Sequence, residues 1–243
     1  IYTHAHTLSL HDALPIYKAL ESVPEEIYES AVDSGKETLL VIDDNQDIRT
    51  YVKTLLKDRY TVIEAADGLS GIRKASKYVP DLIICDVMMP GIDGYECCHR
   101  LKSEMQTSHI PIILLTACSL VEQRVKGYAQ GADSYISKPF TKELLLSRIE
   151  NLIVSKKRLK EYFGDSSFLV KEDISNLDKD FVGKFRAIVE KEIENSELSV
   201  EDIGKEMGMS RVQLYRKMKS LTNYSPNELI RITRLKKAHS MLS

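Results

Sequence analysis

The sequence has no apolar run that approaches the roughly 20 residues a helix needs to cross a bilayer. We therefore predict a cytoplasmic chain that makes no membrane contact. Cysteine is also scarce, and none of the four cysteines forms a C-x-x-C pair with histidines at zinc-ligand spacing. We expect these thiols (Cys85, Cys97, Cys98 and Cys118) to be reduced. With 243 residues, 43% of them hydrophobic, the chain is long enough for two small domains.

The charge is distributed unevenly along the chain. Its overall charge is −2, yet residues 203–243 contain nine basic residues and two acidic ones, Glu206 and Glu228, and so carry +7. A basic segment at one end of an acidic chain predicts a polyanion partner at that end, although a solvated helical face would give the same count. The basic residues are Lys205, Arg211, Arg216, Lys217, Lys219, Arg231, Arg234, Lys236 and Lys237.

Residues 1–16, "IYTHAHTLSLHDALPI", fit no targeting signal because they lack a basic start and contain Asp12 and three histidines. The segment resembles the conceptual translation of a sequencing adapter. We expect it to be an assembly artefact, with the true gene extending further upstream, and its histidines not to be metal ligands. Residues 17–37 are acidic and weakly patterned, so we predict a linker there.

Residues 38–156 alternate short apolar runs with amphipathic stretches. The runs at 39–43, 61–65, 81–86, 111–117 and 134–137 predict strands. The stretches at 46–58, 68–78, 94–104, 121–130 and 142–154 predict helices. This alternation predicts an α/β domain with a doubly wound, flavodoxin-like sheet of five parallel strands, covered by helices on both faces.

Polar side chains follow these strands at the edge where such sheets bind ligands. Asp43 and Asp44 end the first strand, Asp86 ends the third, Thr116 ends the fourth and Lys138 follows the fifth. Three carboxylates at one edge would repel one another unless a cation joined them, and an all-oxygen site suits Mg²⁺. The sequence therefore predicts a magnesium site for phosphoryl chemistry, with Lys138 balancing the acids.

Four segments in order, "VIDDN", "CDVMMPGIDGYE", "ILLTA" and "SYISKPF", together resemble the receiver domain of two-component response regulators. The resemblance implies that Asp86 is the phosphoacceptor and that Mg²⁺ is held by Asp43, Asp44, Asp86 and the backbone carbonyl of Met88.

The same resemblance implies roles for three further residues. Thr116 and Tyr135 would form a switch pair, in which the tyrosine ring rotates inward once the threonine hydroxyl contacts phosphate. Lys138 would contact the phosphoryl group, and its peptide bond to Pro139 would be cis.

Residues 157–177 are polar and predict a second linker, and residues 178–243 predict an all-α domain. Phe181, Phe185, Ile188 and Val189 trace one face of a helix. Further along, Ser199 is a predicted N-cap, Gly208 allows a turn and Ser210 caps a helix from Arg211. This spacing is typical of a helix-turn-helix, whose second helix enters the major groove of double-stranded DNA.

The second helix of that motif has two distinct faces. Leu214, Met218 and Leu221 are predicted to be buried against the first helix. Arg216 could donate to guanine, while Lys219 and Arg211 are suited to phosphates. The predicted DNA-contacting set is Ser210, Arg211, Val212, Tyr215, Arg216 and Lys219. From the pattern alone, an ordinary helical hairpin remains the alternative.

The segment 198–238, "LSVEDIGKEMGMSRVQLYRKMKSLTNYSPNELIRITRLKKA", resembles the first half of an arabinose-regulator (AraC-type) DNA-binding domain. Members of that family carry two helix-turn-helix units joined by a long helix. We expect this chain to hold the first unit and part of the joining helix, so that the domain is truncated. Alone, it should bind DNA weakly and with strong salt dependence.

Together these features predict a phosphorylation-controlled transcription regulator, either an ordinary response regulator or the C-terminal part of a hybrid sensor. A second copy of the chain, forming a homodimer, is a further partner that we consider. The phosphodonor would be a histidine kinase domain, in trans or in lost upstream sequence, because this chain contains no kinase motif and is not itself expected to be an enzyme. A dehalogenase-like phosphohydrolase is an alternative, but it needs D-x-D after the first strand, whereas Asp86-Val87-Met88 follows the third. A second alternative is a receiver that acts only as a phosphate sink, with a helical region that has no DNA-binding function.

Overall fold

The computed structural model describes residues 36–117, 130–161, 175–195, 197–222 and 224–242. Most of the predicted linker 17–37, the predicted helix 121–130 and Cys118 lie outside these residues, as do residues 1–16 and most of the predicted linker 157–177. The elements described below belong to one compact unit, Glu37–Ser243. Within the described ranges, no helix is both long and apolar enough to cross a membrane.

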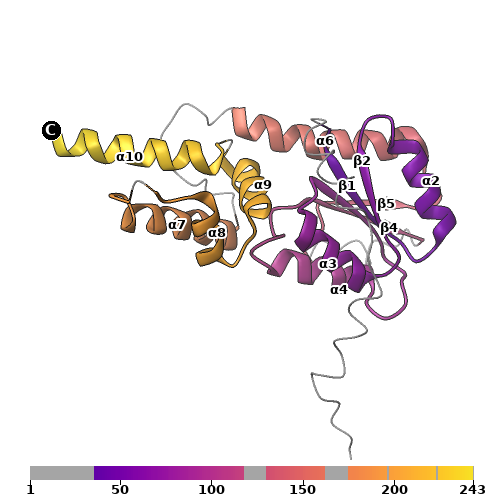
Figure 1. Cartoon of the computed structure of the whole chain (residues 1–243). Helices are drawn as coiled ribbons and strands as arrows, with labels where there is room; N and C mark the ends of the chain where they lie inside the picture. Colours follow the sequence, from indigo (N-terminus) through magenta and orange to yellow (C-terminus); the bar gives the residue numbers. More distant parts are fainter. Residues whose placement is uncertain (1–35, 118–129, 162–174, 196, 223, 243) are drawn as a thin grey trace, which may run out of the picture. The chain divides into compact units, whose positions relative to one another are not determined.

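Five parallel strands form one sheet in the order β2-β1-β3-β4-β5 (Figure 1). Their bounds are β1 Thr38–Ile42, β2 Thr61–Ala65, β3 Leu82–Asp86, β4 Ile112–Thr116 and β5 Ser134–Ser137. The strand order reverses beside β1, which pairs with β2 on one side and with β3 on the other. The predicted doubly wound, flavodoxin-like α/β fold is therefore confirmed.

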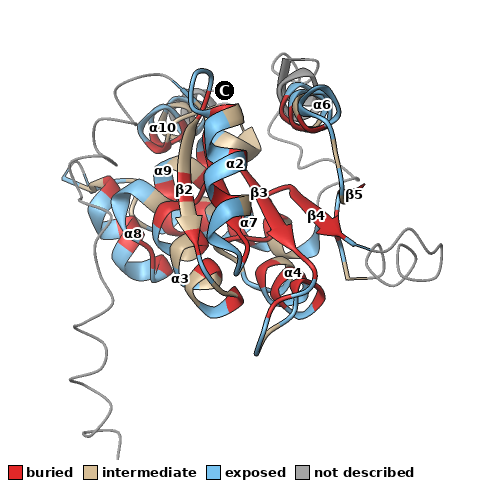
Figure 2. Cartoon of the chain, turned by 90° about the vertical axis from the view of Figure 1, so that its right-hand side faces the viewer, coloured by how far each residue is buried: buried red, intermediate tan, exposed pale blue. Residues whose placement is uncertain are grey.

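Helices pack on both faces of this sheet. Their bounds are α2 Gln46–Leu56, α3 Gly68–Tyr78, α4 Gly94–Ser103 and α6 Lys142–Glu161. α6 runs past residue 156, where the sequence predicts the end of the first domain. Central strands β3 and β4 are buried along their length, while edge strand β2 is partly exposed (Figure 2). The central strands are buried because helices cover both faces of the sheet there.

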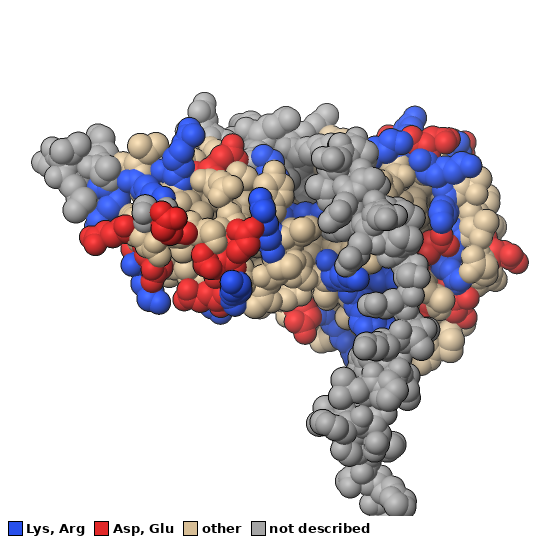
Figure 3. All heavy atoms as spheres, in the orientation of Figure 1, with Lys and Arg blue, Asp and Glu red and all other residues tan. Residues whose placement is uncertain are grey.

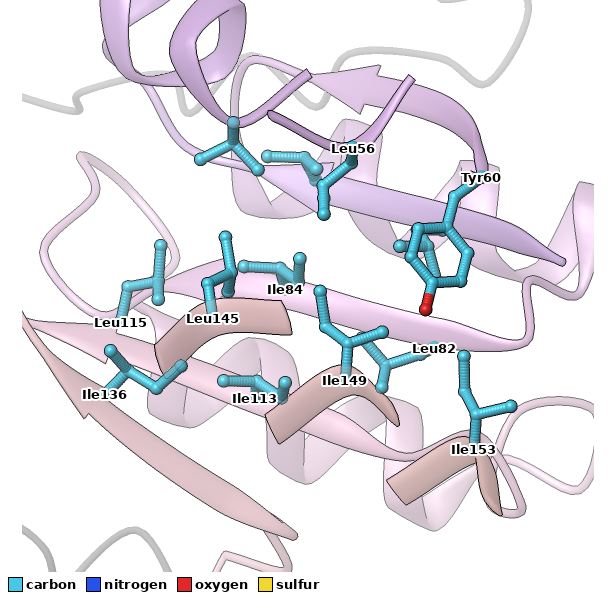
Figure 4. Packing of buried hydrophobic residues seen from close by; sticks show 13 residues of the cluster. Leu56, Tyr60, Leu82, Ile84, Ile113, Leu115, Ile136, Leu145, Ile149 and Ile153 are labelled. Atoms are coloured by element: carbon cyan, nitrogen blue, oxygen red, sulfur yellow. The ribbon is translucent and has the colours of Figure 1, made fainter. Parts of the chain in front are cut away.

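The core on one face of the sheet joins alternate strand residues to α2 and α6 (Figure 4). Leu39 and Val41 of β1 point into this cluster, whereas Leu40 and Ile42 do not belong to it. Successive side chains of a strand point to opposite faces, which explains the alternation. The cluster also contains Val52, Leu56, Tyr60, Leu82, Ile84, Ile113, Leu115, Ile136, Leu145, Ile149 and Ile153.

The C-terminal region is helical, as predicted, with α7 Asn176–Lys191, α8 Val200–Met207, α9 Arg211–Thr222 and α10 Pro226–Leu242. Ser199 and Asp202 form a capping box at the start of α8, which confirms the predicted N-cap. Gly208 ends α8 in the left-handed region, at φ 68°, where glycine carries no steric penalty. Ser210 and Gln213 cap α9 in the same reciprocal way.

A second apolar core holds these four helices together. Phe181, Val189, Leu214 and Met218 are fully buried in it, as their spacing predicts. Leu221 is only partly buried and packs against the edge of this core. The helices α8 and α9 of the predicted helix-turn-helix therefore pack on an apolar core that is separate from the core of the sheet.

We expect Leu214→Ala to lower the free energy of unfolding of the helical region by about 2–5 kcal/mol, because it leaves a cavity in this core. Val212→Ala, two residues earlier on α9 and 41% exposed, is the matched control and should change little. Urea unfolding followed by far-UV circular dichroism measures both, and equal losses would contradict the assigned faces of α9.

Candidate functional site

Asp43 and Asp44 lie at the carboxyl end of β1, where the loop into α2 begins. Asp43 is fully buried, and its carboxylate accepts a hydrogen bond of 2.9 Å from the backbone N–H of Asn45. Asp44 is exposed. Nη1 of Arg49 donates to the carbonyls of Asp43 (2.7 Å) and Asp44 (3.1 Å). A buried arginine on α2 thus fixes the backbone that presents both acids.

Asp86 is the last residue of β3, the strand next to β1, and its side chain is almost completely buried. Carboxylate oxygens of Asp43, Asp44 and Asp86 lie within 4.8 Å of one another. The expectation that strand order brings these acids to one edge therefore holds in the structure.

Lys138 joins two of these acids from the segment after β5. Its Nζ lies 2.8 Å from Asp43 Oδ2 and 2.9 Å from Asp86 Oδ1. The Lys138 backbone N–H also donates to the carbonyl of Thr116 at 2.7 Å, which ties this segment to the end of β4. The Lys138–Pro139 peptide bond is cis, as the sequence resemblance implies.

For both Asp86 and Lys138, burial and the opposite charge of neighbouring groups shift the pKa in opposite directions. Burial raises the pKa of Asp86, and the nearby Asp43 adds to the rise, while the hydrogen bond and charge of Lys138 counter it. Burial by itself would lower the pKa of Lys138, but its hydrogen bonds to Asp43 and Asp86 leave that pKa above its usual value. Lys138 therefore remains a cation at neutral pH.

The acidic cluster fits a hard cation. Its three carboxylates supply only oxygen donors, which suits Mg²⁺, an ion that keeps several waters and uses few protein carboxylates. Asp44 is open to solvent, whereas Asp43 and Asp86 are buried, so the cluster can be reached from one side. The side chain of Met88 is 69% exposed in the loop after β3, and the ligand role of its carbonyl stays a prediction.

Gly94, at the start of α4, is a site residue that sequence reasoning missed. A Cβ atom there would lie 2.2 Å from the backbone oxygen of Asp86, so only glycine allows this approach. Its N–H donates to the carbonyl of Val87 at 3.0 Å. The available signal was its place in "GIDGYE", directly after the predicted phosphoacceptor loop.

Thr116 and Tyr135 lie on the neighbouring strands β4 and β5. Thr116 ends β4 and is 4% exposed, and Tyr135 is 6% exposed. The tyrosine ring thus already occupies a buried position in this structure. Their roles as a switch pair stay predictions.

The predicted DNA-contacting residues gather at the start and on one side of α9. Ser210 lies at its N-cap, Val212 is 41% exposed and Tyr215 is 46% exposed. Lys219 is exposed, and Arg211 is exposed and paired with Glu201 at 3.0 Å. On the face of the molecule visible in Figure 3, basic and acidic side chains are interspersed.

Arg216 and Lys217 differ from the expectation of an open basic helix. Arg216 is half-buried, and its Nη1 donates to the carbonyls of Tyr78 (3.0 Å) and Val79 (3.2 Å). Lys217 is fully buried and its Nζ lies 2.6 Å from Asp178. The number of basic residues in this region is therefore larger than the number of positive charges that are exposed on its surface. Lys217 falls between Leu214 and Leu221 on the helical wheel, a signal that could have identified it.

Comparison with known proteins agrees with this site. Residues 39–150 match the family model described as response regulator receiver domain. The chain is 36% identical over 229 residues to "Histidine kinase P4" of Formosa agariphila, which covers 92% of this chain and 17% of that protein. It is 38% identical over 116 residues to the "DNA-binding dual master transcriptional regulator RpaA" of Synechocystis sp., covering 47% of this chain and 48% of that protein.

Among solved structures, a response regulator receiver domain protein from Clostridium thermocellum aligns with a TM-score of 0.48 and 31% identity over 51% of this chain and 98% of that one. The chain spans less than half the length of both of the curated relatives named above. The family match covers all five strands and the acidic cluster. Residues 39–150 therefore belong to the family of response regulator receiver domains.

Proposed function

We propose that this chain is the output end of a two-component regulator. In it, Asp86 accepts a phosphoryl group and a helix-turn-helix of AraC type in residues 178–243 binds double-stranded DNA. The observation that carries the first half is the buried cluster in which Lys138 contacts both Asp43 and Asp86. The second half is supported by the capped helices α8 and α9, the left-handed Gly208 between them, and the exposed side chains of Val212, Tyr215 and Lys219.

In the proposed reaction a carboxylate oxygen of Asp86 attacks the phosphorus of a phosphohistidine on a histidine kinase domain. The new P–O bond forms as the P–N bond breaks, and the imidazole leaves with the electron pair of that bond. Asp43, Asp44, Asp86 and the Met88 carbonyl would hold Mg²⁺, which supplies positive charge against the oxygens of the transferred group. Lys138 supplies a second positive charge, and the hydroxyl of Thr116 donates to a phosphoryl oxygen.

The parent protein is proposed to be a hybrid sensor rather than a separate regulator. The similarity to a protein named as a histidine kinase extends over 92% of this chain, beyond the receiver and into the helical region. A kinase domain in the same polypeptide would serve as the phosphodonor. Sequencing of the flanking coding DNA tests this, and a complete regulator gene with its own start codon just upstream of the receiver would contradict it.

Mg²⁺ should stabilise the receiver through the acidic cluster. At a concentration of 100 times its dissociation constant, a ligand of the folded state adds about 2.7 kcal/mol to the free energy of unfolding. Asp44→Asn should reduce this gain, because it removes one of the three carboxylates. Asp47→Asn, an exposed acid at the start of α2, is the matched control. Thermal unfolding with and without Mg²⁺ measures the difference, and equal gains in both variants would contradict the site.

Asp86→Asn should abolish formation of a hydroxylamine-labile acyl phosphate from acetyl phosphate, because an amide is not a nucleophile for this reaction. Asp47→Asn should retain it. Phosphate-affinity gels and phosphate release measure the result, with at most one phosphoryl group per chain. Sustained turnover of phosphate esters would instead favour a dehalogenase-like phosphohydrolase.

Lys219→Ala should weaken DNA binding about equally for all sequences and reduce the slope of log affinity against log salt by about 1, as expected for a phosphate contact. Lys184→Ala, an exposed lysine on α7, should leave both quantities unchanged. Fluorescence anisotropy with labelled duplexes over a salt series measures both. A loss confined to one base sequence would contradict the assigned phosphate role.

A further inference from the structure

Arg49, on α2, contacts the backbone of the loop that leads into its own helix. Its Nη1 donates to the carbonyls of Asp43 and Asp44, at 2.7 and 3.1 Å. Its backbone N–H donates to the carbonyl of Asn45 at 3.1 Å. One residue therefore binds three successive carbonyls at the carboxyl end of β1. Because Arg49 is only 8% exposed, water has little access to these bonds.

The peptide unit between Asp44 and Asn45 is held on both sides. Its carbonyl belongs to Asp44 and accepts from Arg49. Its N–H belongs to Asn45 and donates to Oδ1 of Asp43 at 2.9 Å. A peptide unit is planar and turns as one body. The bond from Arg49 therefore fixes the direction of the N–H that holds the Asp43 carboxylate.

The Asp43 carboxylate thereby has a bond on each of its two oxygens. Oδ1 accepts from the N–H of Asn45, and Oδ2 lies 2.8 Å from Nζ of Lys138. With one of these bonds missing, the carboxylate would turn more freely, because the terminal torsion of aspartate is broad. Asp43 is one of the three acids of the cluster, so its orientation bears on how the cluster meets a cation.

The guanidinium of Arg49 has partners on its other nitrogens as well. Nη2 donates to Oε1 of Gln46, and Nε lies 3.9 Å from Oε2 of Glu64 on β2. The Glu64 carboxylate offsets a buried positive charge that would otherwise repel a cation at the acidic cluster. Lysine could not replace this side chain, because an ammonium is a compact point charge without the planar fork of donors that arginine offers.

We propose that Arg49 is a positioning residue for the cation site. Through the peptide unit between Asp44 and Asn45 it sets the direction of the Asp43 carboxylate. It thereby sets the affinity of the acidic cluster for a divalent cation such as Mg²⁺, while Glu64 holds the guanidinium in place. The effect on cation affinity rests on the proposed function, whereas the effect on the peptide unit does not.

Arg49→Lys tests the proposal because it keeps the positive charge and removes the fork of donors. Glu64→Gln is a second variant, which removes the charge opposite Arg49 and leaves the guanidinium in the chain. Val52→Ala is the control for a general loss of stability, since Val52 is fully buried on the same helix and belongs to the apolar core. Far-UV circular dichroism of the full chain verifies that each variant is folded.

Nitrogen-15 NMR of the full chain gives two readouts. In metal-free protein, the Asn45 amide should exchange with water faster in Arg49→Lys and Glu64→Gln than in the parent and Val52→Ala, because its peptide unit is released. In a Mg²⁺ titration, the dissociation constant should rise about tenfold in Arg49→Lys, the lower end of the effect of groups that orient metal ligands. It should rise by a smaller factor in Glu64→Gln and stay unchanged in Val52→Ala.

The other outcomes overturn the inference or one part of it. Equal exchange of Asn45 in all four proteins, or equal changes in Arg49→Lys and Val52→Ala, would refute the positioning role. Faster exchange with an unchanged dissociation constant would refute the effect on cation affinity.

Two further outcomes are decided by the same measurements. If Arg49→Lys does not fold, unchanged exchange and affinity in Glu64→Gln would refute the proposal. A parent chain that binds no Mg²⁺ would overturn the proposed metal site, and with it the effect on affinity. The exchange of Asn45 would then still decide whether Arg49 positions the peptide unit.

Discussion

The ammonium group of Lys138 is the element on which the receiver site depends, because it lies between two buried carboxylates. Asp43 directly follows β1 and Asp86 ends the neighbouring strand β3, and their carboxylate oxygens lie 2.8 and 2.9 Å from that nitrogen. Without a cation, burial and mutual repulsion would favour protonation of one acid. A protonated Asp86 would be a poor nucleophile. In the proposed reaction Lys138 therefore keeps Asp86 in its ionised, nucleophilic form, although Lys138 itself forms no bond to phosphorus.

Backbone geometry holds that arrangement in place. Arg49 binds the carbonyls of Asp43 and Asp44, and the N–H of Lys138 is tied to the end of β4. Gly94 lets α4 approach the oxygen of Asp86 more closely than a residue with a Cβ could. The acids thus sit on a rigid frame, with Asp44 left open to solvent. Such pre-organisation suits the function proposed for this site, in which a cation and a phosphoryl group are bound in fixed positions.

On α9, too, basic side chains are paired with oxygen atoms within the chain. Lys217 is buried against Asp178 and Ser108, and Arg216 binds carbonyls at the end of α3. The residues that make α9 basic are therefore partly engaged within the chain. Burial lowers the pKa of Lys217, an effect that the charge and hydrogen bond of Asp178 counter. Electrostatic arguments from composition alone miss this, because they count every lysine and arginine as solvent-exposed.

Local patterns in the sequence determined most of the fold. Alternating apolar runs and amphipathic stretches predicted the sheet, and strand-end positions predicted that Asp43, Asp44, Asp86 and Lys138 would meet. Capping residues Ser199 and Gly208 marked α8 and its turn, since capping depends on near neighbours in the chain. Tertiary structure alone decided the close approach at Gly94, the burial of Lys217 and the direction of Arg216. These depend on groups far apart in sequence, more than a hundred residues apart for the bonds from α9 to the receiver, and no local periodicity carries such information.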